Sequence, residues 1–331
     1  MTADHDLARP APWGASRLAD DPAPAAAGLD LAGIVTQLRL ARQRWREQQA
    51  RPREIAGREL PSRDALAAIL QDLRGALFPM RLGPPDLRQE SEDYFVGHTL
   101  DTALHALLAQ VRLELRYNAR IGDVPAPAHD ARALEIVRAF GAALPQIREL
   151  LDTDVLAAWR GDPAARSVDE VLVCYPGLHA VIHHRLAHRL HELGVPLIAR
   201  IVAELAHADT GIDIHPGARI GSHFFIDHGT GVVIGETAVI GNNVRLYQAV
   251  TLGARRFATD ADGALQKGGA RHPIVEDDVV IYAGATVLGR VTVGRGASIG
   301  GNVWLTRSVP PGSRIAQASA RDDAADAGAA S

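Results

Sequence analysis

The chain has 331 residues, with 35 Lys and Arg against 39 Asp and Glu, and its formal net charge of −4 gives no electrostatic case for a nucleic acid or an anionic membrane as partner. Hydrophobic residues make up 47% and charged residues 22% of the composition, as in folded globular proteins. Cys174 is the only cysteine, which excludes an internal disulfide and a cysteine metal cluster and favours a reducing compartment. No run of 18 apolar residues could span a bilayer, and residues 1–13 lack the apolar core of a secretory signal. These features predict a cytoplasmic protein.

The first part of the chain is predicted to be disordered and then helical. Residues 1–28 are rich in Ala and Pro and have few large apolar side chains, which indicates disorder. From 29 to 209, apolar residues recur at helical spacing, first in a segment that begins at Leu31 and then in one that Ser62 can cap. This part is therefore predicted to be an α-helical domain. Further helical stretches are expected near 99–119, 130–152 and 168–207.

From residue 210 to 312 the apolar residues recur at every sixth position. One aliphatic series runs from Ile214 to Val250 and a second from Val275 to Leu305. Neither the period of two of a strand nor the 3.6 of a helix fits this spacing, whereas a hexapeptide repeat does. In a triangular parallel β-helix each face uses one hexapeptide and points one aliphatic residue into the core. The repeat therefore predicts a parallel β-helix.

The two aliphatic series are out of step, because 25 residues separate Val250 from Val275, one more than four hexapeptides. The segment 255–269 is rich in Gly and polar residues and has no aliphatic repeat, so it is predicted to be a loop extruded from one corner of the coil. Residues 313–331 are expected to form a flexible tail. Flat faces and exposed ends of a β-helix need cover, and self-association as a trimer is expected to provide it.

Polar residues are densest in the first coils of the predicted β-helix. With about 18 residues in a coil, Asp213 and His228 fall in neighbouring coils and can meet. A His can take a hydroxyl proton near neutral pH, while a carboxylate on its other nitrogen fixes the tautomer. The alternative is that these groups only satisfy the coil corners by hydrogen bonding. The cluster comprises Asp213, His215, His223, Asp227, His228, Thr230 and Glu236.

These residues carry a family resemblance. The string DHGTGVVIGET, which begins at Asp227 and follows Asp213-Ile-His-Pro, precedes the Arg-His-Pro string that begins at Arg271. Over roughly 158–312 the chain resembles the bacterial serine O-acetyltransferases. The resemblance implies transfer of the acetyl group of acetyl-CoA to the hydroxyl of L-serine, giving O-acetyl-L-serine for cysteine biosynthesis. The predicted fold is α+β multidomain, with an α-helical N-terminal domain followed by a left-handed parallel β-helix.

The resemblance also implies roles for single residues. His228 matches the general base and Asp213 its orienting partner. Asp162 and Asp227 match the carboxylates that hold the serine ammonium group. Direct transfer is favoured over an acyl-enzyme, because the sole thiol, Cys174, has no Asp/His motif beside it in the sequence.

Further matched residues concern the serine carboxylate and CoA. Arg271 and His272 match the groups that face the carboxylate, which gives the zwitterion opposite charges at its two ends. CoA is expected in a groove between neighbouring β-helices, where Ala254, Ala283 and Gly301 match small residues that let it approach the main chain.

The resemblance implies few lasting partners. Acetyl-CoA is a co-substrate, and no cofactor or metal is expected to stay bound. The trimer is expected to pair into a hexamer through the helical domain. The sequence ends at Ser331, whereas family members that bind cysteine synthase commonly end in Ile, so that complex is not expected.

Three other interpretations fit parts of the sequence. Acetyl transfer to a sugar or another hydroxyl uses the same scaffold and a His base, but has little use for paired carboxylates opposite Arg271. The spacing of His223 and His228 is similar to that of the zinc ligands in β-helical carbonic anhydrases. A non-enzymatic scaffold is the third. Five histidines between 179 and 191 are interpreted as a helix surface or a subunit contact rather than a metal site.

Overall fold

The computed structural model describes residues 29–48, 60–119, 127–255 and 268–317. The predictions for 1–28, for 256–267 of the extruded loop and for 318–331 of the tail lie outside these residues. Among the described helices none is long and apolar enough to cross a membrane.

The contacts divide the chain into two units, Met1–Gly57 and Arg58–Ser331. The first unit contains helix α1 (Leu31–Gln48), in which no described side chain is buried. The predicted helix at Leu31 therefore exists, but its apolar side chains are exposed. The predicted helical domain is thus divided, since α1 falls in the first unit and the other helices in the second.

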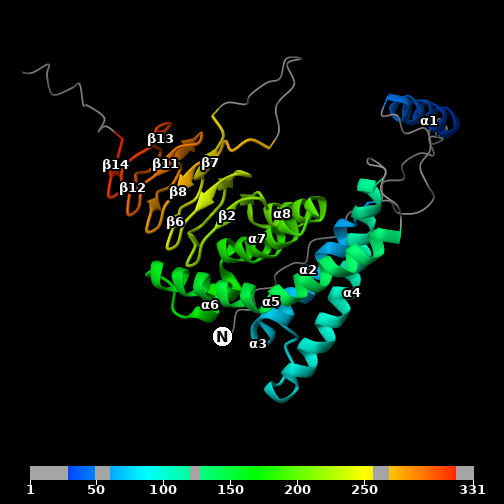
Figure 1. Cartoon of the computed structure of the whole chain (residues 1–331), viewed down its shortest axis with the longest axis horizontal. Coiled ribbons are helices and arrows are strands. Elements are labelled where there is room, and N and C mark those ends of the chain that lie inside the picture. Colours follow the sequence, from blue (N-terminus) through cyan, green and yellow to red (C-terminus); the bar gives the residue numbers. More distant parts are fainter. Residues whose placement is uncertain (1–28, 49–59, 120–126, 256–267, 318–331) are drawn as a thin grey trace, which may run out of the picture. The chain divides into compact units, whose positions relative to one another are not determined.

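The helices of the second unit precede its strands (Figure 1). Ser62 caps α2 as predicted, because its hydroxyl accepts a hydrogen bond from the backbone N–H of Ala65. The apolar face of α2, which includes Leu66 and Leu73, is buried. The helices are α2 (Arg63–Leu77), α3 (Pro79–Leu82), α4 (Glu92–Ala119), α5 (Pro127–Gly161), α6 (Val168–Cys174), α7 (Pro176–Glu192) and α8 (Pro196–Thr210), with a 3₁₀ turn, η1 (Gln89–Ser91).

The helical stretch predicted near 168–207 is confirmed, and two prolines divide it into α6, α7 and α8. Pro176 and Pro196 each stand in the first turn of a helix, where the missing N–H does no harm. The residue before each proline leaves the helical region, as Tyr175 does with φ −85° and ψ 118°. By contrast Pro145 lies inside α5, which continues beyond the predicted end at 152.

Short parallel strands form three sheets, which we call faces I, II and III of the β-helix (Figure 1). Face I contains β1 (Asp213–Ile214), β4 (Val233–Ile234), β7 (Thr251–Gly253), β10 (Thr286–Leu288) and β13 (Trp304–Leu305). Face II contains β2 (Arg219–Ile220), β5 (Val239–Ile240), β8 (Ile274–Val275) and β11 (Thr292–Val293). Face III contains β3 (Phe225–Ile226), β6 (Arg245–Leu246), β9 (Val280–Ile281), β12 (Ser298–Ile299) and β14 (Arg314–Ile315), the last of which lies beyond the predicted limit at 312. From β1 to β13 successive strands lie on successive faces, as a triangular coil requires, and between β13 and β14 face II carries only the isolated bridge of Val293 with Val309.

The coils differ in length, contrary to the uniform 18 residues assumed from the sequence. Val233 pairs with Thr251, 18 positions on, but Asp213 pairs with Val233, 20 positions on. The two extra residues lie between Ile226 and Ile234. Because of them, the six-residue aliphatic series stops coinciding with the strands. Ile226 of this series lies on β3, whereas the next member, Val232, is buried two residues before Ile234 of β4.

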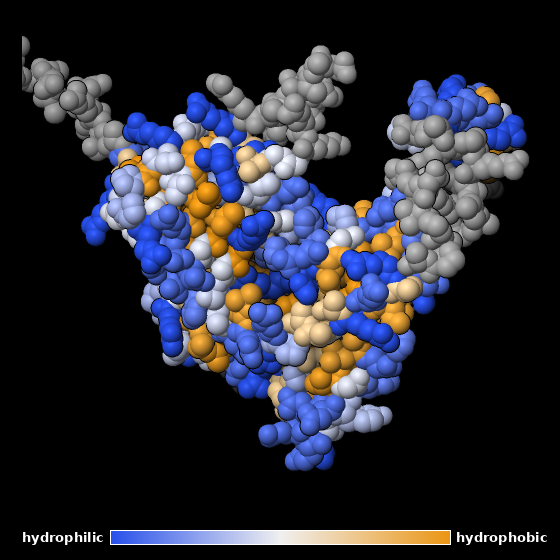
Figure 2. Space-filling model, in the orientation of Figure 1, coloured by the Kyte–Doolittle hydropathy of each residue, from blue (hydrophilic) through white to orange (hydrophobic). Residues whose placement is uncertain are grey.

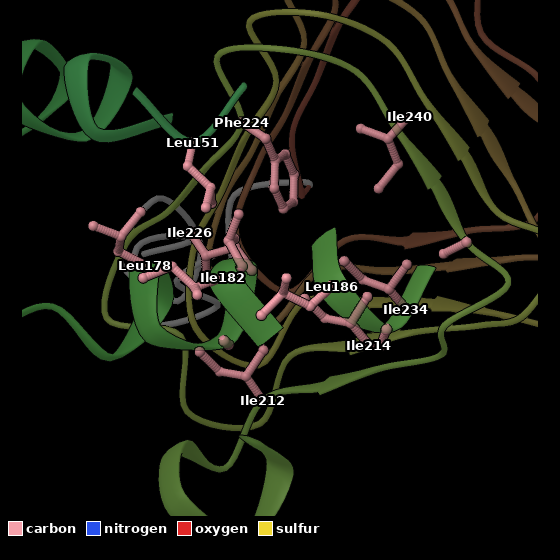
Figure 3. Close-up of a cluster of buried hydrophobic side chains, with 14 of the residues drawn as sticks. Leu151, Leu178, Ile182, Leu186, Ile212, Ile214, Phe224, Ile226, Ile234 and Ile240 are labelled. Carbon is pink, nitrogen blue, oxygen red and sulfur yellow. The ribbon is translucent and has the colours of Figure 1, made fainter. Parts of the chain in front are cut away.

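The helices pack directly on the first coil. Leu151 of α5 and Ile182 of α7 meet Phe224 and Ile226 in one buried apolar cluster (Figure 3). A Cβ atom on Gly177 would lie 2.2 Å from the carbonyl oxygen of Ile226, so only Gly allows this approach of α7. This packing places the end of α5 beside β3.

Candidate active site

His228 stands on the corner between faces III and I, where the first coil has its extra residues. His228 has φ 59°, and Gly229 and Gly231 follow with φ 92° and 79°. A Cβ atom on Gly229 would lie 2.4 Å from Ile212, so this turn requires Gly. The side chain of His228 is 71% exposed. The imidazole therefore projects from the coil into solvent.

Asp227 is the carboxylate paired with His228 in the structure. Its Oδ1 lies 3.8 Å from Nε2 of His228, and its Oδ2 accepts a hydrogen bond of 2.7 Å from Nη2 of Arg245. Asp227 itself is buried. A buried carboxylate needs such a partner, so Arg245 holds it in place.

The predicted contact between Asp213 and His228 is not formed. Within the described residues, no hydrogen bond or ion pair joins the two side chains. Asp213 instead lies near Glu204 and His207, with one potential ligand atom of each within 4.8 Å of the others. The prediction assumed an 18-residue coil, whereas the first coil has two more residues, at the corner that carries His228.

Asp162 follows the end of α5 and is held by two hydrogen bonds. Its Oδ2 accepts from the Tyr175 hydroxyl at 2.5 Å, and its Oδ1 accepts from the Ala164 N–H at 2.8 Å. The Tyr175 bond is the largest cause that lowers the pKa of Asp162, and the positive charges of Arg245 and His228 add to it. Asp162 is therefore ionised near neutral pH.

Arg245 was not predicted from the sequence as a site residue. Its guanidinium carbon lies 4.6 Å from the ring centre of Tyr247 and 5.0 Å from that of Phe225. Phe225 and Arg245 are register partners on face III, in neighbouring coils. The available signal was a charged residue 18 positions after Asp227, which the repeat places in the next coil.

Arg271 and His272 stand on the corner between faces I and II. Arg271 Nη2 lies 2.6 Å from Oε2 of Glu236. The backbone N–H groups of Arg271 and His272 both donate to Oγ1 of Thr237. The Nδ1 atom of His272 accepts from the Thr237 N–H, which leaves Nε2 to carry the proton. Burial and then the charge of Arg271 lower the pKa of His272, so this ring is neutral at pH 7.

The matched residues therefore lie on two different corners. Asp162 and Asp227 accompany His228, but the whole width of face I separates that corner from Arg271. One chain alone cannot bring His228 and Arg271 to the same small ligand.

The residues matched to CoA are divided in the same way. Ala283 and Gly301 stack on the corner that carries His228, where the Asn302 N–H donates to the Ala283 carbonyl at 2.9 Å. Ala254 follows β7 at the other corner. A pocket of 410 Å³ opens beside it, lined by Arg255, Arg271, Arg290 and neighbouring residues.

Two histidine patterns are resolved by the fold. His223 and His228 stand before and after β3, so the chain runs the width of face III between them and their spacing does not make a metal pair. The interpretation of 179–191 as a surface is wrong for His183 and His184, which are buried in α7. Within the described ranges, the grouping able to hold a metal is Glu204, His207 and Asp213.

Comparisons with known proteins agree on one family. Residues 272–307 match the family model for the bacterial transferase hexapeptide (six repeats). A plasmid serine acetyltransferase of Synechococcus elongatus is 60% identical over 272 residues, which is 81% of this chain and 85% of that protein. The serine acetyltransferase of Mycobacterium tuberculosis is 51% identical over 158 residues, 48% of this chain and 65% of its own.

Solved structures show the same likeness. The crystal structure of Entamoeba histolytica serine acetyltransferase 1 in complex with L-cysteine has a TM-score of 0.65 and 39% identity, covering 76% of this chain and 86% of that one. Isoform 3 of the same organism, also in complex with cysteine, has a TM-score of 0.65 and 36% identity, covering 77% and 83%. The helical region followed by a left-handed β-helix is thus confirmed.

Proposed function

This chain belongs to the serine acetyltransferase family, and we propose that it transfers the acetyl group of acetyl-CoA to the hydroxyl of L-serine. The products are O-acetyl-L-serine, a precursor for cysteine synthesis, and free CoA. The observation that carries the proposal is the exposed imidazole of His228 beside two carboxylates, Asp162 and Asp227.

His228 acts as the general base in this proposal. Its imidazole takes the proton of the serine hydroxyl as Oγ attacks the thioester carbonyl. The tetrahedral intermediate is stabilised by backbone N–H groups of the coil. When it collapses, the C–S bond breaks and the CoA sulfur receives the proton from the imidazolium. No acyl-enzyme is needed.

We propose that Asp213 orients His228 when the enzyme acts. The Gly231 N–H donates to the Gly211 carbonyl at 2.8 Å, which stacks the His228 corner on the residues that lead into Asp213. Within the described residues no hydrogen bond fixes the exposed His228 ring, so rotation of its side chain can bring it toward Asp213.

The charges of the site fit a zwitterion. Asp162 and Asp227 offer negative charge for the ammonium group of serine, and Arg271 with His272 offers donors for its carboxylate. Since these two sets stand on different corners, we infer that neighbouring copies of the chain complete each site. The outer surface of face I between the corners carries the exposed apolar side chains Val233 and Trp304, which supports contact between copies there.

This arrangement is the expected trimer, with one site at each contact between β-helices. The contact between two trimers is proposed to lie on the helices. Hydrophobic residues reach the surface over the β-helix and over the helices (Figure 2). Between α4 and α5 they line a groove of 370 Å³ that includes Leu104, Leu108 and Val137. A second trimer packed on this groove gives the proposed hexamer.

Acetyl-CoA is placed along the same contact. Ala283 and Gly301 of one copy and Ala254 of the next are small residues that are not buried, which lets a ligand approach the main chain. Arg255 and Arg290, beside Ala254, add positive charge suited to the CoA phosphates.

The test is release of free thiol from acetyl-CoA by the purified full chain, with L-serine, homoserine or a hexose as acceptor. Serine should give the highest kcat/KM. A preference for the sugar, or CoA binding without turnover on any acceptor, would contradict the proposal. Activity that disappears with removal of a stoichiometric zinc ion would favour the carbonic anhydrase type of site.

A further inference from the structure

A second polar pocket lies in the helical part of the chain, between α2, α7 and α8. Its volume is 340 Å³, and its lining includes Gln71, Arg74, His183 and Asp209. None of these residues belongs to either corner described above. The proposed acetyl transfer makes no use of this pocket.

Arg74 is a half-buried cation without a hydrogen-bonded partner. Its Nε atom is buried, and no oxygen of the described residues accepts a hydrogen bond from it. Burial is the main cause that lowers the pKa of Arg74, because the charge is poorly solvated there. A planar guanidinium binds a carboxylate through two parallel hydrogen bonds. The donors of Arg74 therefore suit a carboxylate ligand.

His183 contributes an acceptor to the same pocket. The residue is 3% exposed, and its Nδ1 donates a hydrogen bond of 2.9 Å to the carbonyl of His179. Its Nε2 then carries a lone pair and has no partner among the described residues. Burial, with a smaller effect of His179, lowers the pKa of His183 to about 4, which keeps the ring neutral at pH 7.

Asp209 brings the opposite charge to the pocket but does not pair with Arg74. Its Oδ2 lies 3.5 Å from Nε2 of His179, and its side chain is largely exposed at the end of α8. No ion pair within 4.0 Å joins Arg74 to Asp209, although both line the pocket. A cation and an anion are thus held apart across a space large enough for a small molecule.

We propose that this pocket binds a small α-amino acid. The carboxylate of the ligand pairs with Arg74, and its ammonium group donates to Asp209 and to Nε2 of His183. The negative carboxylate of the ligand thus faces the positive Arg74, and its positive ammonium group faces Asp209 and His183, so each of the three side chains gains a partner. The pocket is a second amino-acid site, separate from the serine site.

Thermal unfolding of the full chain tests this proposal, with each protein amino acid added singly. At a concentration about ten times its Kd, the right amino acid should raise Tm by about 2–4 °C. The rise should disappear in Arg74→Gln and in Asp209→Asn. It should persist in Arg88→Gln, which removes an exposed Arg outside the pocket, and in Asp162→Asn, which impairs the proposed serine site.

Three results would overturn the proposal. One is that no amino acid gives a rise dependent on both Arg74 and Asp209. Another is an equal rise with acetate alone, which would mean a simple anion site. The third is a change in the mass of the assembly in Arg74→Gln, which would mean that Arg74 meets a second copy of the chain. Asp209→Asn alters an exposed position and keeps the test decisive if Arg74→Gln does not fold.

Discussion

Arg245 donates a hydrogen bond of 2.7 Å to Asp227, the carboxylate that lies beside His228. The guanidinium itself lies over the rings of Phe225 and Tyr247. One cation thus fixes a carboxylate proposed to bind the serine ammonium group. Arg245 is therefore a positioning residue, acting through Asp227 rather than on the reacting atoms.

Replacement of Arg245 should weaken serine binding. In Arg245→Gln the Asp227 carboxylate loses its charged donor, and we expect the KM for serine to rise about tenfold, as loss of one charge-assisted hydrogen bond implies. The value of kcat should change less. Arg245→Lys keeps the charge and should recover part of the loss. Steady-state kinetics at varied serine would show this, and an unchanged KM in Arg245→Gln would contradict it.

His228 and Asp213 should affect kcat rather than binding. His228→Ala should fold normally, because the side chain is 71% exposed, and should lose about 10²–10⁴ in kcat. Asp213→Asn should lower kcat with little change in the KM for serine, whereas Asp162→Asn should raise that KM. The matched control is His98→Ala, which removes another exposed His outside every site proposed here. A normal kcat in His228→Ala would refute the base assignment.

Two glycines should respond in opposite directions to the same substitution. A Cβ atom on Gly235 would lie 2.0 Å from the ring of His272, so Gly235→Ala should destabilise the chain by about 1–3 kcal/mol and displace His272. Gly97 lies exposed inside α4 with no atom within 4 Å of such a Cβ, and Gly97→Ala should stabilise by about 0.5–1 kcal/mol. Denaturant unfolding would measure both. Equal effects would contradict the close packing at His272.

The sequence was sufficient for the faces of the β-helix but not for its corners. The six-residue period from Ile214 onward identifies side chains that point into the β-helix. Some of these lie on a strand, as Ile226 does, and others lie two residues before the matching strand position, as Val232 does, and both of these side chains are buried. The period therefore cannot reveal the two extra residues near His228. Local patterns also gave no account of Arg245, because its partner Asp227 lies in another coil. The prolines at 176 and 196 were readable signals of helix starts, and the helical periodicity around them concealed those breaks.

Stability should fall as the pH falls below 6.5, in part because of His183. The pKa of this residue is about 4 in the folded chain, below its ordinary value of 6.5. Between these values the unfolded chain binds the extra proton, so the stabilisation is present above pH 6.5 and is lost as the pH approaches 4. In His183→Gln the free energy of unfolding should fall less over this range, by up to about 3 kcal/mol less than in the wild type. Denaturant unfolding at a series of pH values would measure the difference. A wild-type slope in His183→Gln would contradict the neutral buried ring.

Complementation between inactive variants should reveal whether each site is shared by two copies. His228→Ala and Arg271→Gln damage different corners, so either variant alone should be nearly inactive. When both chains assemble into mixed trimers, about a quarter of the contacts join an intact His228 to an intact Arg271, and activity should return to about that fraction. The double variant His228→Ala with Arg271→Gln, coexpressed with itself, should stay inactive. If mixed trimers form, as shown by tags of two kinds on one assembly, and no activity returns, the site is not shared across face I. If either single variant retains full activity, the corner it alters takes no part in catalysis.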